Sequence, residues 1–327
     1  MATAAAEVIG LISGAMGIWT FMGDILAPGS ADESIYRINV GVDGTKNPDT
    51  DEGPELVAAP GVIDAVKVYN TNHDLMGTGP GGMIGFNNAG FGDVGASQLG
   101  TQQSIFTEFF AGDDAICIAT IAATMPEGSK WGWVGDWGKL CDLDWFYSGY
   151  KVENGKSVLC TWIDKDHTND IKAGVLGIEW PAFKGTKDSV PTEQEAKEEC
   201  GKGLTAWRNE GEQQMLPLAN AKMASSSSSL SSGPRPSRRF DDSLIISKLR
   251  GQNATELCAS DTALGPDFVS EEEGVYCNME THETAPLCSK DPNAPECFDW
   301  AHPEGPAMIR RKGKRSLRKP SKMVHWG

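Results

Sequence analysis

Short alternating runs of apolar and polar residues dominate the first half of this 327-residue chain. From residue 35 onward, Tyr36, Ile38 and Val40 alternate with polar or small residues, and the turn-forming pair Asp43-Gly44 follows. Further strands are predicted at 62–69, 104–110, 115–124, 131–135, 145–152, 157–163 and 173–180, with Asn154-Gly155 as a hairpin turn. This spacing predicts a mainly β fold, an antiparallel β-sandwich or jelly-roll-like domain.

Composition divides the chain around this β-rich core domain, which is predicted to span 31–186. Within it, the glycine-dense stretch 77–95 is expected to be a connection between strands. Residues 187–242 are expected to hold a polar helix and a Ser/Pro-rich linker. Residues 243–300 form a cysteine-containing extension, in which a strand at 243–248 is predicted to return to the main sheet.

An apolar, glycine-rich helix is predicted in front of this domain, within residues 1–30. Its uncharged run from 8 to 23 is short for a membrane-spanning helix. Small residues recur every four positions and would let two helices approach closely. The residues expected to matter for a membrane contact are Gly10, Gly14, Gly17 and Trp19. Three interpretations stay open: a packing helix, a secretory signal, or a membrane-active helix.

The net charge of −16 is unevenly distributed. Residues 301–327 are expected to be a basic, disordered tail, because the last 18 residues hold eight basic side chains and no acidic one. The rest of the chain is strongly acidic and would repel phosphate backbones, which excludes nucleic acid as a partner of the body. The partner of the basic tail stays unknown.

Eight cysteines, none of them in a C-x-x-C pair, favour disulfides over a zinc site. The even count fits four disulfides and an oxidising compartment, so a secreted or extracellular location is expected. The sequon Asn253-Ala254-Thr255 is compatible with the same route. Spacing leaves the connectivity open, but Cys141 and Cys160 bracket a tryptophan-rich region and are predicted to pair beneath it.

Six of the ten tryptophans lie within fifty residues of one another. The candidate ligand-binding residues among them are Trp131, Trp133, Trp137, Trp145 and Trp162. One interpretation places them in a core packed on the Cys141–Cys160 disulfide. The other makes them an exposed platform for sugar rings, because an indole face stacks on apolar C–H patches while its N–H bonds a polar group. The second interpretation predicts a glycan as the partner.

Alternate oxygen-bearing side chains follow the last of these tryptophans. Their spacing is typical of a calcium loop, with candidate ligands Asp164, Asp166, Thr168 and Asp170. Asn169 and Val175 stand where an EF-hand carries glycine and glutamate, so the open interpretations are an irregular Ca²⁺ site and a solvated loop. Asp164 or Asp166 beside His167 would also suit the acid–base pair of a hydrolase. No cofactor is expected apart from such a Ca²⁺ ion.

Three stretches carry a resemblance to known sequences. They are AICIATIAATMPEGSKWGWVGDWGKLC at 115–141, CTWIDKDHTNDI at 160–171 and GPDFVSEEEGVYCNMET at 265–281. These resemble a group of uncharacterised fungal proteins, which implies a fungal origin and a shared fold but transfers no functional residues. The N-terminal segment resembles the glycine-zipper first helix of fungal HeLo-type cell-death domains, which insert into membranes.

Three functions follow from these observations. The leading one is a secreted, non-catalytic binding or interaction protein that holds carbohydrate through its clustered tryptophans. The second is a membrane-active toxin or cell-death effector, whose N-terminal helix would contact membrane lipid. The third is a hydrolase that uses Asp164, Asp166 and His167, although an enzyme is the less favoured class.

Overall fold

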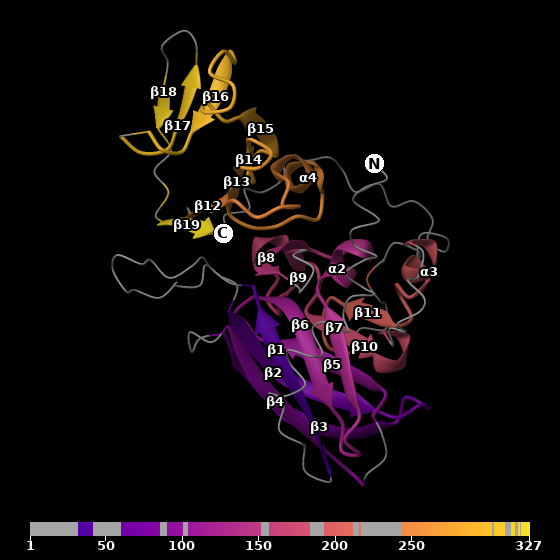
Figure 1. The fold of residues 1–327 in the computed structure, drawn as a ribbon. Coiled ribbons are helices and arrows are strands. Elements are labelled where there is room, and N and C mark those ends of the chain that lie inside the picture. The colour runs from indigo at the N-terminus through magenta and orange to yellow at the C-terminus, as the bar shows by residue number, and fades with distance from the viewer. Residues whose placement is uncertain are drawn as a thin grey trace. The chain divides into compact units, whose positions relative to one another are not determined.

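The computed structural model describes residues 32–41, 60–85, 90–100, 104–151, 157–183, 193–211, 216, 243–302, 304–310, 315–317, 320 and 322–327. They form two compact units, one made of the described residues up to 216 and the other of those from 243 onward (Figure 1). Both units are mainly β, which was predicted for the first unit but, apart from one strand, not for the second. The predicted helix within residues 1–30 lies outside the described residues.

One curled antiparallel sheet of eleven strands builds the first unit. The strands are β1 (Glu33–Val40), β2 (Gly61–Tyr69), β3 (Leu75–Ile84), β4 (Phe91–Gln98), β5 (Phe106–Ala111), β6 (Ile116–Thr124), β7 (Lys130–Val134), β8 (Trp145–Lys151), β9 (Ser157–Ile163), β10 (Val175–Glu179) and β11 (Leu204–Trp207). Their order is β11-β10-β5-β2-β3-β4-β1-β6-β9-β8, and β7 also pairs with β6. The described connections hold the helices α2 (Asp136–Leu140), η1 (Thr168–Asp170), η2 (Trp180–Phe183) and α3 (Glu193–Glu198).

The sheet curls around a single aromatic core. Strands β1 and β5 are separated by three strands in the sheet order, yet the rings of Tyr36 and Phe109 meet edge to face with centroids 5.2 Å apart. Trp180 stacks on Tyr36 and donates its indole N–H to the Thr107 hydroxyl at 2.9 Å. These contacts require the sheet to bend back on itself. A two-sheet sandwich or jelly roll stays a prediction, since the described ladders join all these strands into one sheet.

The glycine-dense stretch 77–95 is not a connection, which corrects the prediction, because most of β3 and β4 lies within it. A Cβ atom on Gly79 would lie 1.7 Å from the carbonyl oxygen of Gly95, and one on Gly81 would lie 1.5 Å from that of Ile63. The neighbouring backbones therefore approach so closely that only glycine fits. A strand with these constraints lacks the apolar alternation by which strands are recognised.

The predicted Cys141–Cys160 disulfide is wrong, because two other pairs form in the first unit. Cys117 on β6 bonds Cys160 on the neighbouring strand β9, with their Cα atoms 5.2 Å apart. Cys141, directly after α2, bonds Cys200, two residues after the end of α3, with a Cα separation of 5.4 Å. Strand pairing and helix placement, rather than proximity in sequence, decided these partners. The predicted polar segment 187–242 thus contributes α3 and β11 to this unit.

The second unit contains a five-stranded sheet, a three-stranded sheet and one described helix, α4 (Ala254–Ala259). The strands are β12 (Ser243–Ser247), β13 (Asp267–Ser270), β14 (Val275–Asn278), β15 (Glu283–Pro286), β16 (Glu296–Asp299), β17 (Ala307–Arg310), β18 (Arg315–Leu317) and β19 (Lys322–Trp326). The sheet orders are β15-β14-β13-β12-β19 and β16-β17-β18. The strand expected at 243–248 is present, but it joins this sheet instead of the main one.

Described parts of the basic tail are paired strands, which differs from the predicted disorder. Strand β19 runs parallel to β12, and within it Val324 and Trp326 are buried while Met323 and His325 are exposed. This alternation gives the tail an apolar face despite its charge. Two disulfides, Cys258–Cys277 and Cys288–Cys297, also stabilise this unit, so the described cysteines form four pairs in all.

Among the described residues, no helix is both long and apolar enough to cross a membrane. The segment with Gly10, Gly14, Gly17 and Trp19 lies outside the described residues, so its predicted membrane contact stays a prediction.

Candidate functional site

Four of the five candidate tryptophans are buried and do not lie on the protein surface. Trp133, Trp137, Trp145 and Trp162 are at most 4 % exposed, and Trp131 is partly buried against the core. The prediction of an exposed tryptophan row is therefore wrong for these four. Trp133 and Trp137 belong to the hydrophobic core of the first unit, and Trp145 and Trp162 are buried as well.

The acidic loop at 164–170 uses carboxylate oxygen atoms in hydrogen bonds within the loop. The Thr168 hydroxyl donates to Asp164 Oδ2 at 2.6 Å, and the Thr168 backbone N–H donates to Asp166 Oδ1 at 3.1 Å. Within the described ranges, no group of three or more His, Cys, Asp or Glu side chains could hold a metal ion. The Ca²⁺ site at Asp164, Asp166, Thr168 and Asp170 stays a prediction.

His167 also turns away from the two carboxyl groups proposed as its partners. Its Nδ1 atom lies 2.9 Å from the carbonyl oxygen of Ile171, and its Nε2 atom lies 3.1 Å from the Asn209 side-chain oxygen. Both ring nitrogens are thus engaged elsewhere. The geometry gives no support to an acid–base pair between His167 and Asp164 or Asp166.

The buried Asp164 carboxyl predicts a pH dependence of stability. Burial raises the pKa of Asp164, and the charge of Asp166 raises this pKa further. Between the ordinary pKa of about 3.9 and the raised one, the folded protein keeps a proton that the unfolded chain has lost, so stability falls as pH rises. We expect wild type to lose stability relative to Asp164→Asn as pH rises above about 4. Parallel melting-temperature curves for the two proteins would contradict this.

A different cluster lies on the outer side of strands β2, β5, β10 and β11, where side chains alternate with those of the core. On β5, Thr107 and Phe109 are fully buried in the core, so the alternate positions of that strand point outward. Register places Lys67 opposite Glu108 and Tyr69 opposite Phe106. We call this cluster the aromatic face, and its residues are Lys67, Tyr69, His73, Phe106, Glu108, Phe110, Trp207 and Glu210.

Aromatic rings from three strands and one turn meet on this face. The Phe106 ring contacts those of Tyr69, His73 and Trp207, with centroids 5.7, 5.3 and 6.5 Å away. Gly177 on β10 makes room for them, because a Cβ there would lie 2.7 Å from the Phe106 ring and 2.8 Å from the Trp207 ring. Phe106 itself is buried, whereas Tyr69 and Trp207 are partly exposed and His73 is exposed.

A carboxyl group lies among these rings. Tyr69 donates its hydroxyl hydrogen to Glu108 Oε2 at 2.6 Å. Partial burial raises the pKa of Glu108, and burial together with the Glu108 carboxyl raises the pKa of Tyr69. Nearby, the Lys67 ammonium lies 2.5 Å from Glu210 and over the Phe110 ring at 4.7 Å. The face therefore combines apolar ring surface with hydrogen-bonding groups that water reaches incompletely.

Sequence reasoning missed this face, although one signal for it was present. The run SIFTEFF places aromatic residues at both odd and even positions, through Phe106, Phe109 and Phe110. A strand with aromatic residues at both odd and even positions presents them on its outer side as well as to the core. Trp207 lies outside the tryptophan-rich region and in a segment predicted to be polar, so no local pattern pointed to it.

The aromatic face is the candidate site that the described geometry supports. It differs from the clustered tryptophans, the acidic loop and the N-terminal helix on which the sequence predictions were based. Comparison with protein-family models and with curated protein sequences finds no match for this chain.

Proposed function

We propose that this chain is a secreted, non-catalytic binding protein that holds a carbohydrate on its aromatic face. One observation carries the proposal: the rings of Tyr69 and Trp207 meet the Phe106 ring on the outer side of the sheet, and Tyr69 donates its hydroxyl hydrogen to the Glu108 carboxyl. Pyranose rings present apolar C–H patches beside hydroxyl groups. Aromatic rings beside a hydrogen-bond acceptor are complementary to that pattern.

The polar groups of the aromatic face suit the binding of a carbohydrate. Glu108 accepts a hydrogen bond from Tyr69, which leaves its other oxygen atom to accept one from a ligand hydroxyl. The Lys67 ammonium, paired with Glu210, supplies donors at the edge of the rings. Tyr69 is hydrogen bonded to the Glu108 carboxyl, and Lys67 is paired with the Glu210 carboxyl. We therefore assign both carboxyl groups to ligand orientation and not to proton transfer.

Secretion is supported by the four disulfides, which form and persist in oxidising compartments. The fungal origin implied by the resemblance and the membrane-active alternative stay predictions. We do not propose the hydrolase, because both ring nitrogens of His167 contact groups other than Asp164 and Asp166.

Trp207→Ala is expected to weaken glycan binding by about tenfold or more, because a ring that stacks on a ligand is a typical hot spot. A glycan array identifies the ligand, and titration calorimetry with the best oligosaccharide measures the affinity. The matched control is Trp131→Ala, which removes another partly exposed tryptophan of the same unit from a strand outside the aromatic face. Circular dichroism and melting temperature establish that each variant is folded.

Glu108→Gln tests the polar half of the face, since glutamine still accepts the Tyr69 hydrogen bond but carries no charge. We expect weaker binding with an unchanged fold. The proposal fails if the wild type binds no glycan on the array, or if Trp207→Ala and Glu108→Gln both bind as wild type does.

A further inference from the structure

We propose that Asn253 is a glycosylation site at which an oligosaccharide is attached to the side-chain amide. The inference rests on the secretory route in the proposed function, and it adds a modified residue to it. Asn253-Ala254-Thr255 is the only Asn-x-Ser/Thr sequence in the chain, and alanine at the middle position is permissive.

The fold presents Asn253 to solvent. Asn253 is exposed and directly precedes α4, with extended backbone dihedral angles of φ −98° and ψ 119°. Its side chain makes no capping hydrogen bond to the helix, although asparagine is among the preferred capping residues. The Asn253 carbonyl oxygen accepts a hydrogen bond from the Leu257 N–H at 3.1 Å, which fixes the backbone at the start of the helix while the residue stays exposed.

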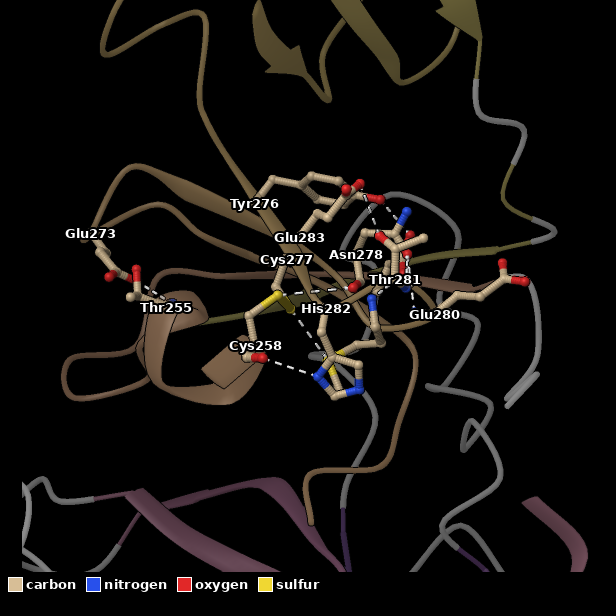
Figure 2. Close-up of a disulfide and its surroundings, with 12 residues drawn as sticks. Thr255, Cys258, Glu273, Tyr276, Cys277, Asn278, Glu280, Thr281, His282 and Glu283 are labelled. Atoms are coloured by element: carbon tan, nitrogen blue, oxygen red, sulfur yellow. Dashed lines mark hydrogen bonds between the residues drawn. A yellow bond between two sulfur atoms is a disulfide. The ribbon is translucent and has the colours of Figure 1, made fainter. Parts of the chain in front are cut away.

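The opposite side of α4 carries the contacts that hold this helix. Ala254 and Leu257 are fully buried, and Cys258 is bonded to Cys277 on β14 (Figure 2). The carbonyl oxygen of Cys258 also lies 2.9 Å from Nδ1 of His282. Because Asn253 itself is exposed, a glycan attached there would extend into solvent and leave these contacts intact.

Thr255 completes the acceptor sequence at the start of α4. Its side chain is exposed, and its backbone N–H donates to Glu273 Oε2 at 3.1 Å (Figure 2). The neighbouring Gly251 N–H donates to Glu272 at 3.3 Å, so the turn between β13 and β14 lies beside the start of α4. The attached sugar would cover this acidic turn and keep other proteins from it.

The transfer forms one bond and breaks one. The amide nitrogen of Asn253 bonds to the anomeric carbon of an oligosaccharide carried on a lipid diphosphate. The bond between that carbon and the diphosphate oxygen breaks, the lipid diphosphate leaves, and the amide nitrogen loses one proton. The secretory pathway supplies the activated oligosaccharide.

The test is intact-mass analysis of the full chain, secreted from a eukaryotic host behind a heterologous signal sequence, before and after treatment with a peptide amidase that releases N-glycans. We expect one glycan set on wild type, its loss in both Asn253→Gln and Thr255→Ala, and its retention in Thr255→Ser. Peptide mass spectrometry should then find aspartate at position 253 after release.

An unmodified wild-type protein in the medium would overturn the inference, as would a glycan that persists in both Asn253→Gln and Thr255→Ala. Because the heterologous signal sequence directs secretion, the result of this test does not depend on where the protein is naturally located. Trp207→Ala separates it from ligand binding, because that variant should keep the glycan on Asn253 while losing affinity for carbohydrate.

Discussion

Gly81→Ala is expected to destabilise the first unit by about 3 kcal/mol or more, or to prevent its folding. The added methyl carbon would lie 1.5 Å from the carbonyl oxygen of Ile63 on the adjacent strand β2. A side-chain rotation cannot relieve this clash, because the obstructing atom belongs to the backbone of a paired strand. Strands β2 and β3 would have to separate, and their ladder hydrogen bonds would be lost.

Gly82→Ala is the matched control in the next position of the same strand. The nearest atom to its added methyl carbon is Val94 Cγ1 at 3.7 Å, which is an ordinary contact distance. Since glycine weakens a strand by roughly 0.5–1 kcal/mol relative to alanine, this variant should be neutral or slightly stabilised. Urea unfolding followed by tryptophan fluorescence compares the two, and equal midpoints would show that β3 does not approach β2 as closely as described.

Removing the Cys141–Cys200 disulfide should cost about 4 kcal/mol, since cross-linking a loop of this length restricts the unfolded chain by that amount. The two cysteines are 59 residues apart in sequence and join the residues that follow α2 and α3. We expect Cys141→Ala/Cys200→Ala to lower the urea midpoint of the first unit with its secondary structure retained. Circular dichroism at zero urea checks the retained structure.

The single variant Cys141→Ala provides the control for connectivity. It should leave a free thiol at Cys200 and an intact Cys117–Cys160 bond, which peptide mapping under non-reducing conditions identifies. A free thiol at Cys160 would restore the pairing first predicted from sequence. An unchanged urea midpoint in the double variant would show that this bond contributes little to stability.

Much of the sheet could be predicted from local patterns, because a strand with one buried face records that burial in its own alternation. Tyr36, Ile38 and Val40 alternate in sequence and are all buried in β1. The same reasoning failed for β3, whose glycines respond to neighbouring backbones and not to a core. It also failed for β19, whose alternation is surrounded by basic residues.

Almost none of the candidate site could be predicted from the sequence. Its rings come from β2, β5 and β11, which are adjacent or nearly so in the sheet but are separated by more than one hundred residues between Tyr69 and Trp207. No short motif joins them. The clustered tryptophans were conspicuous in sequence because they fill the core, and that same role buries them.

Sequence by itself determined the mainly β character of the first unit and the number of disulfides that the cysteines allow, because these depend on neighbouring residues and on composition. The turns predicted at Asp43-Gly44 and Asn154-Gly155 lie outside the described residues. Only the tertiary structure decided which cysteines pair, which tryptophans reach the surface and which side chains surround Glu108. Those outcomes depend on the spatial order of the strands within the sheet and on how strongly the sheet curls. Both are set by contacts between residues distant in the chain, which leave no local pattern.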